Sequence, residues 1–478
     1  MKRPGEYQTS NHEPVALSVA DFWNNLDKAQ IVLKSLENFD ETAFTSEPLS
    51  RYIEVKGNEI VLDDNVMLNA QDQLIFNNGE LVNGSTLSTK NFAKFLRLCR
   101  SPDGIVYGIS AQNILIKDSY LLMIEKIEND REDKVTKGCT LIGSPGIGKT
   151  HFSLYLAFYL TRRYTSTNII YQQPDGSNVT ITLHINQRNR SVIKFPRGLG
   201  GEDPEVTKDS FYIADSIAPS LCKTIYTFLV TTPKNVRWHE FKKYNPKRYY
   251  APIWTEKEIW DVWEWDEQYK ERIPKVRVEE LIRRWGCIPR RVFVEYNNEP
   301  DILELISHCD TYTFLKNEGG DLNDNYTGKA IYIIPNSDFT DRKYVPASEE
   351  ICKALYRYHE SNTKEKIIEI IKNFARTAGG PLSGRFFEMM AHDVLRKGGK
   401  FKVRRLTDND EDDLDLQELE LKYFDEINEI TPGCYNVPKD PTFKSIDSLV
   451  PNRNGSNHLY QTTIAEKHNI KVMLSLYY

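Results

Sequence analysis

The chain has no long apolar run, no long basic tract and no paired cysteines, and each absence excludes a class of protein. No run of about 18 apolar residues is present, so no transmembrane helix is expected. The first residues, MKRPGEYQTSNHEP, are polar, which argues against a signal peptide. Basic tracts never exceed two or three residues, and the formal net charge is −6. Any contact with nucleic acid would therefore come from local patches rather than from the overall charge.

The seven cysteines are scattered along the chain and odd in number, and no two of them form a Cys-x-x-Cys pair. This spacing argues against a zinc site and against a disulfide framework. We expect reduced core thiols in an intracellular protein.

The sequence does contain enough apolar residues for several folded domains. Of its 478 residues 40% are hydrophobic, so two to four domains are expected. Residues 1–100 combine a helical pattern over 21–39 with hairpin patterns over 52–62 and 73–82. They carry no chemical motif, which favours a docking or regulatory region.

Strand and helix patterns alternate between residues 101 and 300. Helical patterns lie at 151–164, 255–273 and 276–286, and strand patterns at 139–143, 168–186, 210–216, 224–233 and 248–254. This alternation predicts an α/β fold in which helices cover both faces of a parallel sheet.

The C-terminal part predicts a second, smaller α/β region. A helix is expected over 384–399 and a strand over 400–406. The acidic run at 408–415 is interpreted as a solvated loop rather than a metal site.

A glycine-rich motif between an apolar strand and an apolar helix predicts phosphate binding. Residues 143–150 fit Gly-x-x-x-x-Gly-Lys-Thr. Such glycines let backbone N–H groups turn toward a phosphate at a helix N-terminus. The lysine reaches the β- and γ-phosphates, and the threonine hydroxyl binds Mg²⁺. The predicted nucleotide-binding residues are Gly143, Ser144, Pro145, Gly146, Ile147, Gly148, Lys149, Thr150, His151 and Arg290.

The metal also needs a carboxylate at the end of a neighbouring strand, and Asp215 at the end of an apolar strand supplies it. Ser216 follows it, where many ATPases carry a second acid. The acidic residues that could polarise water instead are Glu202, Asp203, Glu205 and Asp209, and the sequence does not choose among them.

Two further polar positions are candidate nucleotide sensors. Thr231 and Thr232 end an apolar strand and could sense a γ-phosphate, although a simple strand end would look the same. Arg290 or Arg291 follows a Gly-x-x-Pro turn and could reach the phosphates from a lid, the alternative being a pair of surface arginines.

Polar residues in the last hundred positions are spaced as in a Mg²⁺-dependent phosphodiesterase. Glu388 lies in an amphipathic helix, Asp447 precedes a turn-rich spacer, and Gln461 lies in a strand-like segment. Two oxygen ligands would hold the metal, and Lys467 would offset the negative charge. An ordinary small α/β domain is the alternative interpretation.

Together these motifs resemble the Crinkler effectors and the related retrotransposon hot spot proteins over residues 95–478. The stretches that carry the resemblance include LIGSPGIGKTHFSLYLAFYL, WGCIPRRVF, GRFFEMMAHDVLRKGGKFKVRRL and LYQTTIAEKHNIK. The resemblance implies a P-loop NTPase of the AAA+/STAND type, with a parallel sheet and a helical lid. A small restriction-endonuclease-like α/β domain of the PD-(D/E)xK kind would follow it. The resemblance implies that Glu388 is the helix acid, Asp447 the central metal acid and Gln461 the Glu/Gln position of the last strand.

The expected organisation therefore has four parts. Residues 1–100 form a regulatory or docking region, 101–300 the NTPase with its lid, 301–370 a helical connector and 371–478 the nuclease-like domain. ATP or GTP and Mg²⁺ are the expected cofactors. DNA is the expected partner, and homo-oligomers and host nuclear proteins are further possible partners. The family implies delivery into a host or target cell and action on nuclear DNA there, with cell death as the result.

Two departures from the family pattern leave other functions open. Thr463 stands where the family usually has a lysine, so that role would pass to Lys467 or Lys471, with His468 nearby. Gln461 is neutral and would bind Mg²⁺ more weakly than glutamate. The alternatives are a nucleotide-switched binding protein with an inactive nuclease fold, and a STAND-type signalling ATPase without a nucleic-acid role.

Overall fold

In a computed structural model, the chain folds into two compact units. Unit 1 comprises residues 1–301 and 308–342, and unit 2 comprises residues 302–307 and 343–478. The structure describes residues 22–23, 25–35, 49–82, 92–99, 113–132, 136–174, 180–186, 191–195, 207–219, 225–233, 239–317, 326–362, 364–404, 408–439, 443, 446–452 and 457–464. The four segments expected from the sequence stay a prediction.

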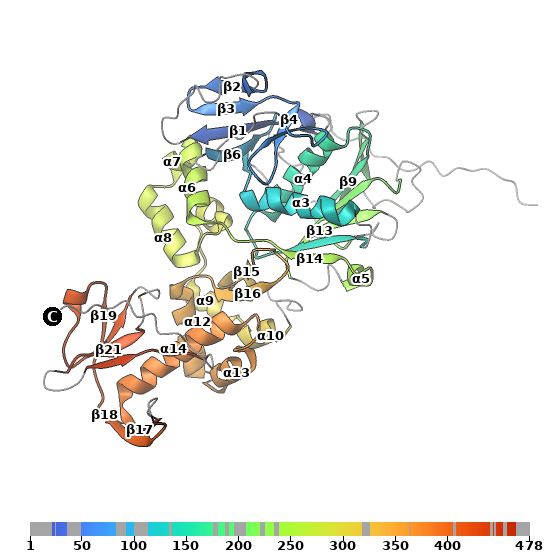
Figure 1. Cartoon of the computed structure of the whole chain (residues 1–478). Helices are drawn as coiled ribbons and strands as arrows, with labels where there is room; N and C mark the ends of the chain where they lie inside the picture. Colours follow the sequence, from blue (N-terminus) through green and yellow to red (C-terminus); the bar gives the residue numbers. More distant parts are fainter. Residues whose placement is uncertain are drawn as a thin grey trace, which may run out of the picture. The chain divides into compact units, whose positions relative to one another are not determined.

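Unit 1 begins with a five-stranded antiparallel sheet of order β2-β3-β1-β6-β7. Its strands, coloured blue in Figure 1, are β1 (Gln30–Ser35), β2 (Ile53–Lys56), β3 (Glu59–Leu62), β6 (Phe92–Arg97) and β7 (Asn113–Leu115). The hairpin expected over 52–62 is confirmed as β2 and β3. Two short 3₁₀ turns, η1 (Leu26–Lys28) and η2 (Leu49–Arg51), also lie in this region.

The helix expected over residues 21–39 is wrong for residues 30–35, which form strand β1. Ile31, Val32 and Leu33 are all fully buried, since β1 lies between β3 and β6 in the sheet. A central strand buried on both faces has a continuous apolar run, which periodicity does not distinguish from a buried helix. Farther along, β4 (Val66–Leu68) pairs with β5 (Leu74–Phe76), and an isolated bridge joins Ile75 to Leu81 within the hairpin segment 73–82.

The main sheet of unit 1 has seven strands in the order β11-β10-β9-β12-β13-β8-β14. Five of them are parallel: β8 (Gly138–Ile142), β9 (Ile169–Pro174), β12 (Phe211–Asp215), β13 (Tyr226–Thr231) and β14 (Lys247–Tyr250). The strands β10 (Thr180–Asn186) and β11 (Ser191–Phe195) extend one edge in antiparallel fashion. A parallel sheet with helices between its strands agrees with the α/β fold expected from the sequence.

Helices α3 (Asp118–Glu132) and α4 (Lys149–Arg163) flank strand β8 in the sequence. Nearly all of α4 is buried, which explains the apolar run at residues 154–160. The remaining helical elements of unit 1 are α5 (His239–Lys242), α6 (Glu256–Trp265), α7 (Glu267–Arg272), α8 (Lys275–Trp285), the π-helical turn η5 (Arg290–Val294), α10 (Thr311–Lys316) and α11 (Thr327–Ala330), followed by strand β15 (Ile331–Pro335). Thr255 and Glu258 form a reciprocal capping box at the start of α6.

Unit 2 combines helices with a small sheet. Its helices are α9 (Ile302–Ser307), α12 (Glu349–Asn362), α13 (Lys364–Phe374) and α14 (Gly380–Lys397), and strand β16 (Arg342–Pro346) begins at the boundary of the unit. A four-stranded sheet of order β19-β20-β21-β22 follows. It consists of β19 (Leu421–Phe424), β20 (Tyr435–Pro438), β21 (Ser448–Val450) and β22 (His458–Tyr460), with the 3₁₀ turn η6 (Ile427–Glu429) in a connection.

The acidic run at 408–415 was expected to be a loop, and this expectation is wrong for most of it. Residues 411–416 form strand β18 (Glu411–Leu416), which pairs with β17 (Gly399–Arg404). Lys400 lies opposite Asp415, and Arg404 lies opposite Glu411. Opposite charges in directly facing positions stabilise a hairpin that isolated propensities would disfavour.

Among the described helices, none combines the length and the apolar character that crossing a bilayer requires.

Candidate functional site

The glycine-rich loop connects the carboxyl end of β8 to the first turn of α4. Strand β8 ends at Ile142, and α4 begins at Lys149. Gly146 and Gly148 have φ angles of +81° and +86°, in the left-handed region that favours glycine. The backbone therefore turns sharply ahead of a 15-residue helix whose N-terminus carries a partial positive charge.

Contacts from three other segments fix the shape of this loop. The Trp254 Nε1–H donates to the carbonyl of Ile147 at 2.9 Å, and the Tyr120 hydroxyl donates to the carbonyl of Gly148 at 3.1 Å. The Ser144 hydroxyl accepts a hydrogen bond from the Ile333 amide at 3.0 Å. These bonds use two carbonyls and one side chain of the loop, so they hold it in place without occupying its N–H groups.

Lys149 is largely buried, and its ammonium group bends back onto the loop. Nζ donates to the carbonyls of Gly143 at 2.9 Å and Ser144 at 2.7 Å. A buried ammonium needs such partners, since burial without them would favour its neutral form. A phosphate would offer stronger, charge-assisted bonds to the same group.

Asp215 lies at the carboxyl end of β12 and is only 2% exposed. Burial raises the pKa of its carboxyl, although hydrogen bonds with Thr150 and Ser216 and the charge of Lys149 oppose that rise. The next residue, Ser216, has a φ of +59°, and its hydroxyl donates to Asp215 Oδ1 at 3.1 Å. A strained non-glycine residue beside a buried carboxylate is typical of a functional site.

Strand β13 lies between β12 and β8, and its carboxyl end carries two hydroxyl groups. Thr231 is fully buried, and the Oγ1 atoms of Thr231 and Thr232 have no hydrogen-bond partner among the described residues. Buried hydroxyls without partners are rare and call for an explanation. The carboxyl ends of parallel strands share one edge, so these hydroxyls lie at the same edge of the sheet as Asp215 and the loop.

Of the two arginines considered as sensors, the structure brings Arg290 to the loop. Its amide donates to the carbonyl of Gly146 at 3.3 Å, and its side chain is exposed. Arg291 is buried, where it pairs with Glu295 and lies over the Trp285 ring. Arg290 belongs to a π-helical turn, a rare conformation that is frequent at functional sites.

His151 follows the loop in the first turn of α4. Burial and the neighbouring Arg290 charge lower the pKa of its imidazole to about 4. The ring is therefore neutral at physiological pH, and it can accept or donate a hydrogen bond without adding charge.

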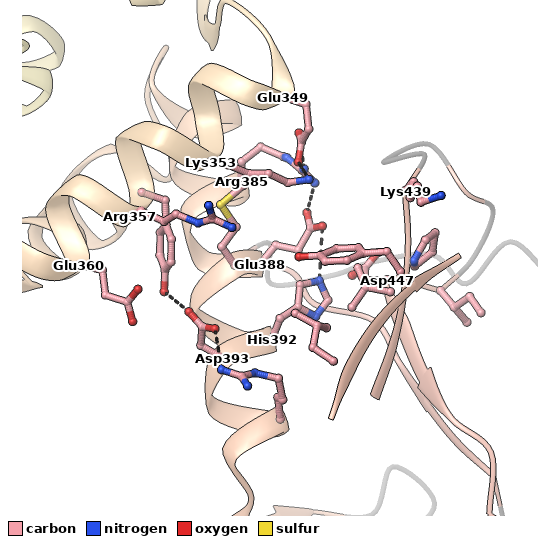
Figure 2. A pocket seen from close by; sticks show the side chains of 18 residues that line it. Glu349, Lys353, Arg357, Glu360, Arg385, Glu388, His392, Asp393, Lys439 and Asp447 are labelled. Atoms are coloured by element: carbon pink, nitrogen blue, oxygen red, sulfur yellow. Dashed lines mark hydrogen bonds and ion pairs between the residues drawn. The ribbon is translucent and has the colours of Figure 1, made fainter. Parts of the chain in front are cut away.

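Glu388 and Asp447 line the same cavity of unit 2, whose volume is about 350 Å³ (Figure 2). Glu388 comes from α14, and Asp447 precedes β21. Arg385 Nη1 lies 2.6 Å from Glu388 Oε2, and His392 Nε2 lies 3.6 Å from Glu388 Oε1. Burial disfavours the charge of Glu388, but its His392 and Arg385 neighbours outweigh that effect, so its pKa lies below the ordinary value.

Gln461 does not join Glu388 and Asp447 at this cavity. Strand β22 ends at Tyr460, one residue earlier, and Gln461 and Thr463 are both exposed. Thr462 contacts Asp447 instead, since its backbone N–H and its hydroxyl donate to Asp447 Oδ2 at 2.5 and 2.8 Å.

Several site predictions fall outside the residues that the structure describes. These are the lysine role proposed for Lys467 or Lys471, the nearby His468, and the acids Glu202, Asp203 and Glu205. Within the described part of the chain, no group of three or more His, Cys, Asp or Glu side chains is arranged to hold a metal ion.

Sequence reasoning missed the residues that surround Glu388. Arg385 bridges Glu388 and Glu349, and His392 Nδ1 lies 2.9 Å from the Tyr435 hydroxyl. Arg385, Glu388 and His392 are spaced i, i+3 and i+7, so they share one face of a helix. This spacing could have identified Arg385 and His392 as neighbours of Glu388. Tyr435 and Glu349 come from other elements, so no sequence pattern places them there.

Each of the two units carries one candidate site. Unit 1 is an α/β unit with a glycine-rich loop, a lysine and a buried aspartate at one edge of its sheet, and unit 2 has a charged cavity. The chain is similar to two curated proteins from Phytophthora infestans, Crinkler effector protein 16 and Crinkler effector protein 15. Each is 22% identical over 399 residues, which cover 75% of this chain.

These two matches confirm the resemblance to Crinkler effectors that the motifs indicate. The matched regions make up 59% and 60% of the relatives, so the chain spans about three fifths of the length of the curated relatives it matches. No family model matches the chain. The resemblance to retrotransposon hot spot proteins stays a prediction.

Proposed function

We propose that unit 1 is a P-loop NTPase unit that binds ATP or GTP together with Mg²⁺ at residues 143–151. The observation that carries the proposal is the juxtaposition of the left-handed loop glycines, Lys149 and Asp215 at one edge of a parallel sheet. The nucleotide phosphates would replace the carbonyls that Lys149 now contacts. Arg290, Thr231 and Thr232 would approach the γ-phosphate from the lid and from the end of β13.

The oxygen atoms at this edge of the sheet fit Mg²⁺. The Thr150 hydroxyl and the Asp215 carboxylate are close enough to hydrogen-bond, and the raised pKa of Asp215 means that its charge lacks sufficient compensation. Mg²⁺ typically takes one or two protein oxygens and completes its octahedron with phosphate oxygens and water. When bound, the ion would neutralise charge on the phosphates as the terminal group leaves.

Isothermal titration calorimetry tests this proposal directly. We expect heat on titrating ATP or GTP with Mg²⁺ into the wild type, and its loss in Lys149→Ala. Lys137→Ala is the matched control, because Lys137 is exposed and directly precedes β8, at the end opposite the loop. If the wild type gives no heat with either nucleotide, the proposal is wrong.

We further propose that unit 2 is a PD-(D/E)xK nuclease-like domain that cleaves DNA with Mg²⁺ under the control of the nucleotide. The support is that Glu388 and Asp447, far apart in the sequence, line one cavity in a relative of Crinkler effectors. The action would take place on nuclear DNA of a host or target cell and would promote cell death. Homo-oligomers and host nuclear proteins are further partners under this proposal.

The described residues also favour a second function, an inactive nuclease fold that holds nucleic acid or a protein partner. Gln461 is exposed, Thr462 occupies Asp447 Oδ2, and Arg385 occupies Glu388. These side chains therefore fit a metal less well than those of unit 1.

Plasmid nicking separates the two functions. Wild type and Asp447→Ala are compared in Mg²⁺, and DNA binding is measured in parallel by fluorescence anisotropy at low salt, where phosphate contacts are strongest. Nicking by the wild type alone supports the nuclease. Nucleotide-dependent DNA retention without nicking supports the binding protein, and absence of both leaves a signalling ATPase.

A further inference from the structure

Gln173 lies at the same sheet edge as Asp215, one strand farther from the loop. Strand β9, which contains Gln173, is parallel to β12, and Ile213 is opposite Tyr171 and Ala214 opposite Gln172. The same register places Gln173 opposite Asp215. Neighbouring strands are about 4.8 Å apart, so these two backbone positions are adjacent.

The side chains of Gln173 and Asp215 lie on the same face of the sheet. Side chains alternate along a strand, so Gln173 shares its face with Tyr171. The Tyr171 hydroxyl lies 2.8 Å from Ser153 Oγ on α4 and 3.4 Å from Asp215 Oδ2. That face is therefore the one covered by α4, the helix that begins with Lys149 and Thr150. Gln173 is two residues nearer the edge than Tyr171, and it is only 2% exposed.

The usual source of a water-orienting group is missing beside Asp215. Ser216 occupies the position of the second acid, and its hydroxyl is turned toward Asp215 Oδ1. Asp209, one of the acids considered from the sequence, precedes Phe211 at the amino end of β12 and is exposed. Five residues of strand separate it from the carboxyl end, roughly 16 Å, which is too far to touch the same water.

We propose that Gln173 orients the water that attacks the γ-phosphate; this inference rests on the nucleotide-binding function proposed above. The water oxygen forms the new bond to the γ-phosphorus, and the bond from that phosphorus to the β–γ bridging oxygen breaks. The nucleoside diphosphate leaves with that oxygen, and the water proton passes to a phosphate oxygen and then to solvent. The carboxamide of Gln173 accepts a hydrogen bond from the water and donates one toward the γ-phosphate, so it stays neutral throughout. A glutamine performs this role in some other NTPases.

Steady-state NTP hydrolysis and nucleotide affinity are measured for Gln173→Ala, Gln173→Glu and the control Gln172→Ala. Gln172 is the matched control because it is the adjacent buried amide of the same strand, and it contacts the Tyr212 hydroxyl on the opposite face. We expect Gln173→Ala to lower kcat about 100-fold, because the attacking water loses the hydrogen bonds that orient it. Its nucleotide Kd should stay within about threefold of wild type. Gln173→Glu should retain or raise kcat and make it depend on pH, because a carboxylate can take the proton.

The outcomes separate this inference from the function on which it rests. If the wild type binds no nucleotide, the proposed function is wrong. If it binds nucleotide but shows no turnover, or if Gln173→Ala turns over like wild type, the inference about Gln173 is wrong. A parallel loss of kcat in Gln172→Ala would likewise overturn it, because a general packing defect would then explain the effect. Melting temperatures of all variants with bound nucleotide identify any that fail to fold.

Discussion

Asp215 is a carboxylate whose surroundings do not favour its charge. The side chain is buried, and burial raises the pKa of the carboxyl despite its hydrogen-bond partners. A group whose pKa is higher in the folded than in the unfolded chain contributes most to stability below its unfolded pKa. That contribution is lost as the pH rises through the folded pKa. At neutral pH the buried charge therefore lowers the stability of the nucleotide-free protein.

Removing this charge should stabilise the nucleotide-free protein and abolish its response to magnesium. Asp215→Asn keeps the shape of the side chain, so we expect its free energy of unfolding at pH 7 to rise by about 1 kcal/mol. The gain should shrink as the pH is lowered, since Asp215 then becomes protonated in the wild type. Thermal melting from pH 5 to pH 8, with and without Mg²⁺ and nucleotide, measures both effects. A variant less stable than wild type at pH 7 would contradict this account. Ser216→Ala removes a hydrogen bond to the carboxylate, so it should lower the stability at pH 7 rather than raise it.

Gly146 meets two constraints that another residue would not satisfy. Its φ is +81°, and a Cβ atom there would lie 2.9 Å from Arg290 Cβ. The left-handed conformation alone costs a non-glycine residue about 1–2 kcal/mol.

Gly146→Ala should therefore destabilise unit 1 by about 2 kcal/mol and weaken nucleotide binding, because the loop and Arg290 must separate. Gly328→Ala is the control, since a Cβ there would make only ordinary contacts of 3.7 Å with Pro145 of the same loop. Urea denaturation of both variants gives the comparison. Equal stabilities for the two would show that the left-handed turn contributes nothing.

At the scale of elements, helix α4 extends from the candidate phosphate site to the N-terminal sheet region. Its last turn carries Arg162, whose side chain is 2% exposed. The guanidinium donates to the carbonyls of Asp27 and Ala29, each at 2.8 Å, and lies 3.0 Å from Asp64 Oδ1. Arg162 thus joins Asp27, Ala29 and Asp64 to the helix that begins at the loop.

Arg162→Met should keep the apolar contacts of the side chain but leave those carbonyls without donors. We expect a loss of about 2 kcal/mol in the free energy of unfolding, typical of hydrogen bonds to a charged group. Arg163→Met is the matched control, because its side chain is 25% exposed and its ion pair with Glu128 spans 3.7 Å. Urea denaturation measures both variants. If both substitutions lower the free energy of unfolding equally, the buried hydrogen bonds of Arg162 contribute no more to stability than the partly exposed ion pair of Arg163.

The sequence predicted elements well where patterns are local. The strand at 139–143, the glycine loop and the following helix are confirmed. Each of them has a signal within its own residues: an apolar run, glycines at a defined spacing, and a second apolar run. Strand β1 was mistaken for a helix, since only its neighbours in the sheet decide its conformation. The environment of Glu388 was not predictable for a similar reason. Tyr435 and Glu349 reach it through tertiary contacts that spacing along the chain does not encode.

At the scale of the whole molecule, we expect the two units to unfold in separate transitions, of which nucleotide shifts only that of unit 1. A ligand that binds only folded unit 1 stabilises that unit by about 2.7 kcal/mol at 100 times its Kd. In a unit of this size that energy raises the melting temperature by a few degrees. Differential scanning calorimetry should therefore show one transition that shifts with Mg²⁺ and nucleotide, and the shift should vanish in Lys149→Ala.

Affinity measurements on both units test whether the nucleotide controls unit 2. Under nucleotide control, the site of unit 1 and the cavity of unit 2 are coupled, and coupling free energies are reciprocal. DNA bound by unit 2 should then change the nucleotide affinity of unit 1 by the same factor by which nucleotide changes the DNA affinity. We expect a factor of about 5 or more in both directions, measured by anisotropy with labelled DNA and with labelled nucleotide. Lys149→Ala should remove the nucleotide effect without altering DNA binding in its absence. Two affinities that do not respond to each other would mean that the units act independently, whatever each of them binds.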